Sequence, residues 1–429
     1  MIPRTAIPKG VRVFTPEETA QRRAVEAKLL SIFQRWGFRE IVTPTFEYLE
    51  VFEPPTGEEA GDQIFKFVDR QTGRLLALRV DITSQVARLV ASTMRQAPLP
   101  LRLAYAATVF RYHEPRAGRQ REFEQIGVEL IGLNLPEADA EMIAMAVEGC
   151  QAMGLPAFQI DVGQVEVVRG LLNALQPPEE LRPQLISAIR RKDALELDLL
   201  LAGFSADTGL LEAIRALPKL YGRREILDEA AQLSLPPASR AALANLTEVV
   251  TILENYGLAD HVILDLAETH DFEYYSGIVL GAFARGLGYQ LASGGRYDRL
   301  IGQFGYPCPA TGFSFDLERV LAAAESLPRA AGPDVLLIDF SPDKRAAHRL
   351  ARQLRDRGIA VARDIIKRDL AGSLAYARAS GIRRAVILGS AEQPPETVRI
   401  HDVSTETQHT LPLATFVLAV AQGDPLWPA

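Results

Sequence analysis

The sequence is poor in cysteine, which limits the covalent and metal chemistry available to the fold. Only Cys150 and Cys308 are present among 429 residues. Two such distant cysteines supply neither a disulfide framework nor the Cys-x-x-Cys spacing of a structural zinc site. We therefore expect two packed thiols, no disulfide network and no metal.

The sequence also lacks long apolar runs and a surplus of basic residues. No stretch of about 18 apolar residues predicts a membrane span, and residues 1–10 lack the apolar segment of a secretory signal. Hydrophobic residues make up 48% and charged residues 24%, as in ordinary globular proteins. The net charge is −7, whereas proteins that bind many phosphates usually carry a basic surplus. We expect a cytoplasmic protein with neither a membrane nor a tRNA partner.

A domain boundary is predicted at residues 327–333, which read Leu-Pro-Arg-Ala-Ala-Gly-Pro with breakers at both ends. Beyond it, apolar and amphipathic segments alternate. They predict strands at 334–340, 359–363 and 384–388, and helices at 343–357 and 370–379. This alternation indicates a small α/β domain with a parallel or mixed sheet.

The first long element is an amphipathic segment at residues 16–37, with Leu29, Leu30, Phe33 and Trp36 at helical spacing. It leads into Phe-Arg-Glu-Ile-Val-Thr-Pro-Thr-Phe at 38–46, which predicts a strand ending near a proline. Taken alone, the pair is an ordinary helix–strand unit.

A short apolar strand at residues 75–78 leads to Asp81 and Thr83. A carboxylate and a hydroxyl at the exit of a strand can bind an amino group through charge-assisted hydrogen bonds. The same side chains could instead cap a helix that begins at Ser84. The two roles are compatible.

Residues 109–132 read as a strand, a loop rich in arginine and glycine, and a returning strand. In the second strand Phe123, Gln125, Gly127 and Glu129 share one face because alternate residues point the same way. A buried amide and carboxylate are costly without a partner, and a ligand with two nitrogens would provide one. The alternative is a charged hairpin on a solvated face.

Three further segments carry polar or glycine-rich motifs. Residues 269–277 read Thr-His-Asp-Phe-Glu-Tyr-Tyr-Ser-Gly, 292–300 read Ala-Ser-Gly-Gly-Arg-Tyr-Asp-Arg-Leu, and 311–319 read Thr-Gly-Phe-Ser-Phe-Asp-Leu-Glu-Arg. The Gly-Gly string alone would indicate only a tight turn. Because they occur in a fixed order and at matching spacing, the segments are stronger evidence for a functional site together than each is alone.

In this order the segments resemble the histidyl-tRNA synthetases, which are class II enzymes. The helix–strand pair is similar to motif 1, which builds the dimer interface in those enzymes, and 109–132 and 311–319 are similar to motifs 2 and 3. The resemblance implies an α+β fold with an antiparallel sheet flanked by helices. It also implies a catalytic-like domain at 1–165 and 251–326, a helical insertion at 166–250 and an anticodon-binding-like α/β domain at 333–429.

The resemblance further implies a histidine site. In those enzymes the residues matching Gln125 and Glu129 bind the histidine substrate, and the one matching Arg111 lies at the ATP α-phosphate. The implied site comprises Asp81, Thr83, Arg111, Gln125, Glu129, Tyr274 and Tyr275.

The sequence departs from the synthetase pattern mainly where nucleotide would bind. His270 replaces an arginine that stabilises the charge of the reacting carboxylate and phosphate, and losing such a donor costs on the order of 10²- to 10³-fold in turnover. Asp316 replaces a glycine and would repel a triphosphate, and Asp81 replaces a longer glutamate. In the motif 2 loop, His113 stands where the synthetases have an acidic residue, and Glu114 stands where they have a basic one. We expect no catalytic residues and no cofactor; outside its motif, His270 would be an ordinary polar loop residue.

A chain that keeps the residues of the histidine site but lacks the catalytic arginine resembles the regulatory subunits of ATP phosphoribosyltransferase, which are histidyl-tRNA synthetase paralogues. That resemblance implies a homodimer within a hetero-oligomer, with the short-form catalytic subunit as partner and L-histidine as feedback ligand. The alternatives are an active histidyl-tRNA synthetase with an atypical site and a paralogue with neither ligand nor partner. The anticodon-binding-like tail favours the synthetase, because many regulatory subunits lack that domain.

Overall fold

The computed structural model describes residues 5–52, 63–112, 120–155, 157–269, 272, 274–324, 332–366 and 368–422. The chain divides into two compact units, Met1–Pro328 and Arg329–Ala429. Each unit contains its own sheet and its own hydrophobic core.

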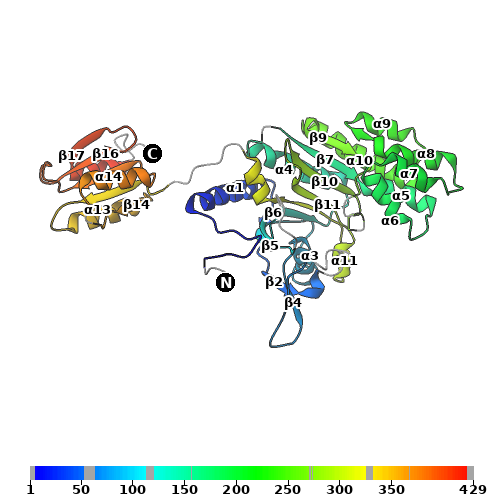
Figure 1. The fold of residues 1–429 in the computed structure, drawn as a ribbon, viewed down its shortest axis with the longest axis horizontal. Helices are drawn as coiled ribbons and strands as arrows, with labels where there is room; N and C mark the ends of the chain where they lie inside the picture. The colour runs from blue at the N-terminus through cyan, green and yellow to red at the C-terminus, as the bar shows by residue number, and fades with distance from the viewer. Residues whose placement is uncertain are drawn as a thin grey trace. The chain divides into compact units, whose positions relative to one another are not determined.

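The larger unit is built on a nine-stranded sheet (Figure 1). Only the β1–β5 and β7–β9 pairs are parallel, and the other neighbours are antiparallel. In spatial order the strands are β1 (Arg39–Glu40), β5 (Leu101–Phe110), β6 (Glu122–Ile131), β12 (Ala310–Asp316), β11 (Gln290–Arg296), β10 (Ile278–Ala284), β7 (Phe158–Gln164), β9 (Val262–Asp265) and β8 (Tyr221–Gly222).

Helices cover both faces of this sheet. On one face, α1 (Pro16–Arg35), α4 (Pro136–Ala152) and α12 (Leu317–Ala323) share a core with Ile126 and Val128 of β6. On the other, α3 (Thr83–Ser92) and α11 (Leu300–Gln303) pack with Phe123 and Ile131 of the same strand. The alternation of β6 therefore directs the 123, 125, 127, 129 series toward α3 and α11.

Helix α1 shows how local sequence sets an element. Thr15 accepts a hydrogen bond from the backbone N–H of Glu18, whose side chain accepts one from the N–H of Thr15. This capping box, with Pro16 in the first turn, starts the helix. Leu29 and Phe33, one turn apart, then fix its buried face.

A layer of helices lies beside the β7 and β9 end of the sheet (Figure 1). Its side chains join the core that α1 and α4 share with the sheet, so the layer and the sheet are packed as one body. The helices are α5 (Val165–Leu175), α6 (Arg182–Arg190), α7 (Ala194–Leu201), α8 (Thr208–Ala216), α9 (Glu225–Ala231) and α10 (Pro237–Asn255), with 3₁₀ turns at Leu217–Lys219 and Ala259–His261.

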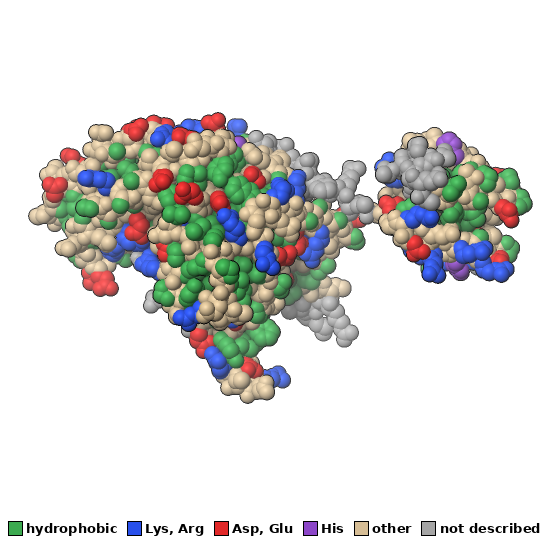
Figure 2. Space-filling view, turned by 180° about the vertical axis from the view of Figure 1, so that it is seen from behind, with side chains coloured by type: hydrophobic (Ala, Val, Ile, Leu, Met, Phe, Trp, Pro, Cys, Tyr) green, Lys and Arg blue, Asp and Glu red, His purple; other side chains and the backbone are tan. Residues whose placement is uncertain are grey.

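A small antiparallel sheet, in the order β2-β4-β3, projects from the larger unit (Figure 1). Its strands are β2 (Phe46–Tyr48), β3 (Lys66–Val68) and β4 (Leu75–Leu78), and a 3₁₀ turn follows β2 at Leu49–Val51. Hydrophobic side chains appear on the surface of this lobe (Figure 2).

The smaller unit has a mixed five-stranded sheet in the order β14-β13-β15-β16-β17. Strands β14, β13 and β15 are parallel, whereas β16 and β17 are antiparallel. Its elements are β13 (Val335–Asp339), α13 (Arg345–Arg355), β14 (Val361–Arg363), α14 (Leu370–Ala379), β15 (Arg384–Leu388), β16 (Thr397–Asp402), β17 (Gln408–Pro412) and α15 (Leu413–Gln422).

The expected α+β fold with a mainly antiparallel sheet is confirmed. Two elements differ from expectation. The strand predicted across 38–46 is limited to Arg39–Glu40, because the chain turns away through Thr43 and Pro44 before it pairs again at Phe46. The helix predicted at 343–357 spans Arg345–Arg355, because Asp343 hydrogen-bonds the N–H of Arg345 ahead of the helix. Cys150 and Cys308 are both buried free thiols.

Candidate functional site

Paired strands place polar residues on the sheet face that carries α3 and α11. Glu129 of β6 lies opposite Gly312 of β12, and Gln125 lies opposite Asp316. Residues directly opposite one another in an antiparallel pair point to the same face. Gln125, Glu129 and Asp316 therefore lie along one face of two adjacent strands.

The carboxylate of Glu129 is almost fully buried, with 1% of the residue exposed. Thr83 and Tyr105 donate hydrogen bonds of 2.8 and 3.1 Å to its Oε1, and the hydroxyl of Tyr297 donates to Oε2. Burial raises the pKa of Glu129 to about 7, although the three hydroxyls favour the ionised form. The site thus contains a carboxyl group whose charge changes near neutral pH.

Glycines make room for this arrangement. A Cβ on Gly312 would lie 1.8 Å from Oε2 of Glu129. A Cβ on Gly295 would lie 2.9 Å from the ring of Tyr275 and 2.4 Å from the carbonyl of Ile278. The Gly-Gly string lies within β11, and its partner Gly312 lies within β12, so these glycines serve close approach inside the sheet and not the tight turn that the string alone would indicate.

Tyr274 and Tyr275 line the same region. Their rings meet edge to face at 4.9 Å, and Tyr274 stacks on Tyr297 with centroids 5.8 Å apart. Burial, followed by the nearby Asp81 carboxylate, raises the pKa of Tyr274 well above its usual range. Tyr274 therefore keeps its hydroxyl proton and can donate a hydrogen bond to a ligand.

Gln125 and Asp81 have different hydrogen-bonding states. The Oε1 atom of Gln125 is buried without a hydrogen-bond partner among the described residues. Asp81 accepts a 3.1 Å hydrogen bond from the backbone N–H of Ser84, in the first turn of α3. It therefore has the helix-capping role, which was one of the two roles that the sequence predicted for it. Thr83 does not cap the helix but points to Glu129. Burial raises the pKa of Asp81, and the cationic Arg111 opposes that shift.

Arg111 lies where β5 ends. Its Nε donates a 2.9 Å hydrogen bond to the carbonyl of Val80, and its guanidinium lies 5.2 Å from the ring centroid of Phe123. Asp81 interacts electrostatically with Arg111, Glu129 and Tyr274. Thr83 binds Glu129, and Tyr274 contacts Tyr275. Gln125 lies on the same face of β6 as Glu129. The predicted departures His270, His113 and Glu114 lie outside the described residues.

Asp316 forms an ion pair of 2.9 Å with Arg319, and its carboxylate also caps α12 by accepting the N–H of Arg319 at 3.0 Å. Arg319 donates a second hydrogen bond to the carbonyl of Gln290 at 2.8 Å. Burial raises the pKa of Asp316 to about 6, with Arg319 opposing the shift. Asp316 thus supplies Arg319 with an internal counter-ion. From the sequence we expected only that Asp316 would repel a triphosphate.

Tyr105 and Tyr297 were missing from the predicted site. Tyr297 lies in the quoted Gly-Gly-Arg-Tyr-Asp string, where only the glycines and their turn were considered. Tyr105 lies opposite Gly127 on β5, and a Cβ on Gly127 would lie 2.7 Å from its hydroxyl. The signal available for Tyr105 was a tyrosine between small residues, Ala104 and Ala106, near the middle of a strand.

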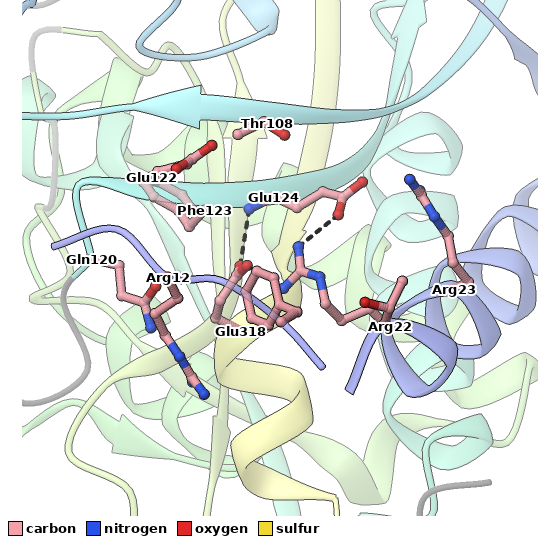
Figure 3. A pocket seen from close by; sticks show the side chains of 11 residues that line it. Arg12, Arg22, Arg23, Thr108, Gln120, Glu122, Phe123, Glu124 and Glu318 are labelled. Atoms are coloured by element: carbon pink, nitrogen blue, oxygen red, sulfur yellow. Dashed lines mark hydrogen bonds and ion pairs between the residues drawn. The ribbon is translucent and has the colours of Figure 1, made fainter. Parts of the chain in front are cut away.

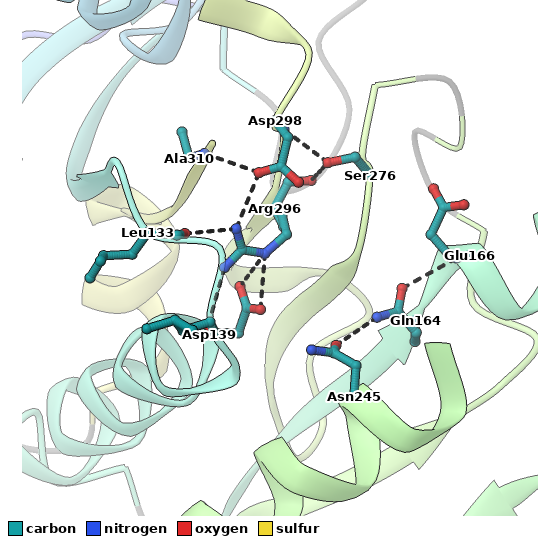
Figure 4. A network of polar contacts seen from close by, with 10 residues as sticks. Leu133, Asp139, Gln164, Glu166, Asn245, Ser276, Arg296, Asp298 and Ala310 are labelled. Atoms are coloured by element: carbon teal, nitrogen blue, oxygen red, sulfur yellow. Dashed lines mark hydrogen bonds and ion pairs between the residues drawn. The ribbon is translucent and has the colours of Figure 1, made fainter. Parts of the chain in front are cut away.

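A buried ion network supports the segment that follows the tyrosines (Figure 4). Arg296 pairs with Asp139 at 3.0 Å and with Asp298 at 3.1 Å. The N–H of Asp298 donates to the hydroxyl of Ser276 at 2.8 Å, and the N–H of Ser276 donates to the carbonyl of Arg296 at the same distance. The network fixes Ser276 against the end of β11.

A cavity of about 290 Å³ lies on the opposite side of β5 and β6, against α1 and α12 (Figure 3). At its centre Arg22 binds two carboxylates of the lining, Glu124 at 2.9 Å and Glu318 at 2.5 Å. Glu318 also accepts the backbone N–H of Glu124. Phe123 is shared with the face that carries Gln125 and Glu129, but neither of those two residues lines the cavity, and the pairing of Arg22 cross-links α1, β6 and α12.

Within the described ranges, no group of three or more His, Cys, Asp or Glu side chains is arranged to hold a metal ion. Over the same part of the chain, no helix combines the length and the apolar character needed to cross a membrane.

Comparisons with family models agree with the two units. The histidyl-tRNA synthetase model matches residues 10–320, and the anticodon-binding domain model matches residues 334–422.

Comparisons with known proteins find relatives over nearly the whole chain. An ATP phosphoribosyltransferase regulatory subunit of Syntrophotalea carbinolica is 44% identical, over 95% of this chain and 96% of its own length. One of Geobacter metallireducens is 42% identical, over 92% of this chain and 93% of its own.

Two solved structures are similar in fold. A Bacillus halodurans protein described as an ATP phosphoribosyltransferase regulatory subunit/histidyl-tRNA synthetase has a TM-score of 0.78 and 31% identity, covering 91% of this chain and 100% of its own. A histidyl-tRNA synthetase from Nostoc has a TM-score of 0.76 at 23% identity, covering 97% and 99%, which supports the fold alone.

Proposed function

Because the chain belongs to the family of ATP phosphoribosyltransferase regulatory subunits, we propose that it is the non-catalytic regulatory subunit of such an enzyme, acting in histidine biosynthesis. Its partner is the short-form catalytic subunit, in a cytoplasmic hetero-oligomer. The C-terminal unit does not favour the synthetase alternative, because regulatory subunits that match nearly the whole chain also include this unit.

The ligand that the site suits best is L-histidine, and the observation that carries this proposal is the environment of Glu129. A buried carboxylate surrounded by three hydroxyl groups suits an imidazole ring, which carries N–H groups and can become cationic. In the part of the chain that the structure describes, the Oε1 of Gln125 has no hydrogen-bond partner, and the Asp81 carboxyl lies near Glu129 and Tyr274. Both groups suit an α-amino group.

The residues at the position where the synthetases bind ATP support a non-catalytic role. Arg319 already has an anionic partner in Asp316, so a phosphate group would have to displace a carboxylate of the protein itself. A ligand that carries no phosphate meets no such competition. The proposed protein therefore keeps amino-acid recognition without adenylate formation.

Feedback then requires histidine to favour one state of the complex. A ligand shifts an equilibrium only by its differential affinity for the two states. The proposed subunit binds histidine more tightly in the assembly state whose catalytic subunit is less active.

Homodimer formation is part of the proposal. Val42, in the motif 1 segment, is 91% exposed, and several apolar side chains of the projecting lobe are also exposed. They are Phe46, Tyr48, Phe67, Val68 and Leu75. Exposed apolar groups of this kind suit burial against a second copy.

Pyrophosphate exchange with histidine and ATP tests the proposal. We expect no exchange from the purified chain, with an active histidyl-tRNA synthetase as positive control, because the reaction requires adenylate formation. Robust exchange would establish the alternative, an active synthetase.

Reconstitution provides the positive test. Adding the chain to a short-form catalytic subunit should raise phosphoribosyltransferase activity, and histidine should lower the activity of the mixture. A mixture with the same activity as the catalytic subunit alone would refute the regulatory assignment.

A further inference from the structure

Helix α5 begins directly behind the segment that carries the two site tyrosines. The N–H of Val165, its first residue, donates a 3.1 Å hydrogen bond to the carbonyl of Gly277. The side chains of Val165 and Val168 belong to the core that joins the sheet to the helical layer. The first turn of α5 is therefore in direct contact with the tyrosine segment, so a displacement of that segment acts on this helix.

Arg169, one turn into α5, holds the same segment through its side chain. Its Nη2 donates hydrogen bonds to the carbonyls of Phe272 and Tyr275, the latter at 3.0 Å. The guanidinium carbon lies 4.5 Å from the ring centroid of Phe272, and Glu166 forms an ion pair with Arg169 on its own helix. Only 12% of the Arg169 side chain is exposed. The geometry uses the planar, multiply donating character of arginine, which an ammonium group does not reproduce.

The segment held by Arg169 reaches the ligand side through two tyrosines. Tyr275, whose carbonyl Arg169 binds, packs its ring against Gly295. Tyr274 stacks on Tyr297, and the Tyr297 hydroxyl donates to Glu129. A continuous set of direct contacts thus runs from α5 to the carboxylate at the centre of the site.

The other end of the segment is held by a buried ion network. Ser276 is bound to Arg296 and Asp298, which belong to the buried ion network of β11 (Figure 4). Because Ser276 is hydrogen-bonded to this network, we expect an adjustment of Tyr274 and Tyr275 on ligand binding to be passed toward Arg169. Coupling between sites needs such a physical element, and here α5 supplies it.

We propose that Arg169 is a positioning residue for the amino-acid site, and that α5 carries the occupancy of that site to the helical layer of α5 to α10. The proposal deepens the proposed function and rests on it, because it names the route by which bound histidine changes another part of the subunit. Arg169 does not touch the ligand; it acts through the backbone of the tyrosine segment.

Hydrogen exchange on the unaltered full-length chain, with and without saturating L-histidine, tests the route directly. We expect amide exchange in α5 and at residues 274–277 to slow severalfold when histidine binds. Helix α13 of the other unit provides an internal reference that should not change. Exchange in α5 that is indifferent to histidine would overturn the proposal.

Two substitutions of Arg169 test the positioning role. Arg169→Gln should weaken histidine binding about tenfold, a loss close to that of a single charged hydrogen bond, and should abolish the slowing in α5. Arg169→Lys, which keeps the charge but loses the fork, should give an intermediate affinity. Arg190→Gln, an exposed arginine of α6 in the same layer, is the matched control and should bind as the unaltered chain does.

A merely structural role predicts a different pattern. In that case Arg169→Gln would lower the free energy of unfolding and leave the histidine dissociation constant unchanged, which would refute the proposal. If Arg169→Gln does not fold, Arg169→Lys and the exchange data on the unaltered chain decide the question. If the unaltered chain binds no histidine at all, both this inference and the proposed ligand are wrong; normal binding by the Arg169 variants would contradict this inference alone.

Discussion

The hydroxyl of Tyr297 donates a hydrogen bond to the carboxylate of Glu129, although 168 positions of sequence separate the two residues. Tyr297 follows β11 and Glu129 lies on β6, with β12 between these strands. Thr83 and Tyr105 complete the shell around the same carboxylate. The central acid of the site is therefore surrounded by hydroxyl groups from three separate parts of the chain.

Glu129→Gln should weaken histidine binding at least tenfold. The amide removes the negative charge that would bind an imidazole N–H and turns one acceptor into a donor facing hydroxyl groups, and charged hydrogen bonds are worth about 1.5–3 kcal/mol. Calorimetric titration with L-histidine measures the effect. Glu122→Gln, on the same strand but with the opposite side-chain direction, serves as the control and should bind normally. Equal affinities of Glu129→Gln and the unaltered chain would refute the pocket assignment.

The raised pKa of Glu129 predicts a pH-dependent stability in the absence of ligand. The folded chain, with a pKa of about 7, keeps this proton up to higher pH than the unfolded chain, whose carboxyl has the ordinary value of 4.5. Stability is therefore lost as pH rises from about 4.5 to 7, by on the order of 3 kcal/mol for a displacement of this size.

Urea unfolding of the unaltered chain and of Glu129→Gln at pH 5, 6 and 7.5 isolates this contribution. The amide cannot ionise, so the stability of the unaltered chain relative to the variant should fall as the pH rises. A difference that stays constant across this range would show that Glu129 titrates at its ordinary value.

Asp316→Asn should raise the affinity of the chain for ATP about tenfold. The substitution removes the counter-ion of Arg319 and its negative charge, while asparagine still caps α12. Asp316→Gly removes both the charge and the capping side chain, and should gain a similar affinity at a cost of only about 0.3 kcal/mol in stability, because glycine is tolerated at the N-cap. Equilibrium dialysis with ATP measures the gain. Binding as weak as that of the unaltered chain in both variants would contradict the role assigned to Asp316.

Asp139→Asn should destabilise the larger unit by about 3–5 kcal/mol. Arg296 is 5% exposed, and the loss of its main partner leaves a buried charge incompletely compensated. Asp343→Asn removes the partner of the exposed Arg345 and should change stability by less than about 1 kcal/mol. Chemical unfolding compares the two variants, and similar small losses would show that the network around Arg296 is replaceable.

The sequence predicted those parts of the site that depend on local periodicity. Gln125 and Glu129 share a face because strand side chains alternate, and this holds whatever the neighbouring strands are. The motif segments likewise predicted the fold class and the family, both of which are confirmed. The capping interpretation of Asp81 was also accessible, since capping acts over three residues.

Other features depended on contacts that local pattern does not encode. The order of β5, β6, β12 and β11 determines that Tyr105 and Tyr297 meet Glu129. The reach of Arg169 to the carbonyls of Phe272 and Tyr275 joins residues more than 100 positions apart, and no motif contains it.

By itself, then, the sequence determined the fold class, the family, several of the strands and helices, and the set of acidic, amide and tyrosine groups available for an amino-acid ligand. Only the tertiary structure decided how those groups are used: Glu129 becomes a buried acid with a pKa near 7, Asp316 neutralises Arg319, and Arg169 supports the tyrosine segment. The physical reason is that burial and charge pairing depend on which distant segments pack together, and packing sets both the pKa of a carboxyl and the partner of a guanidinium.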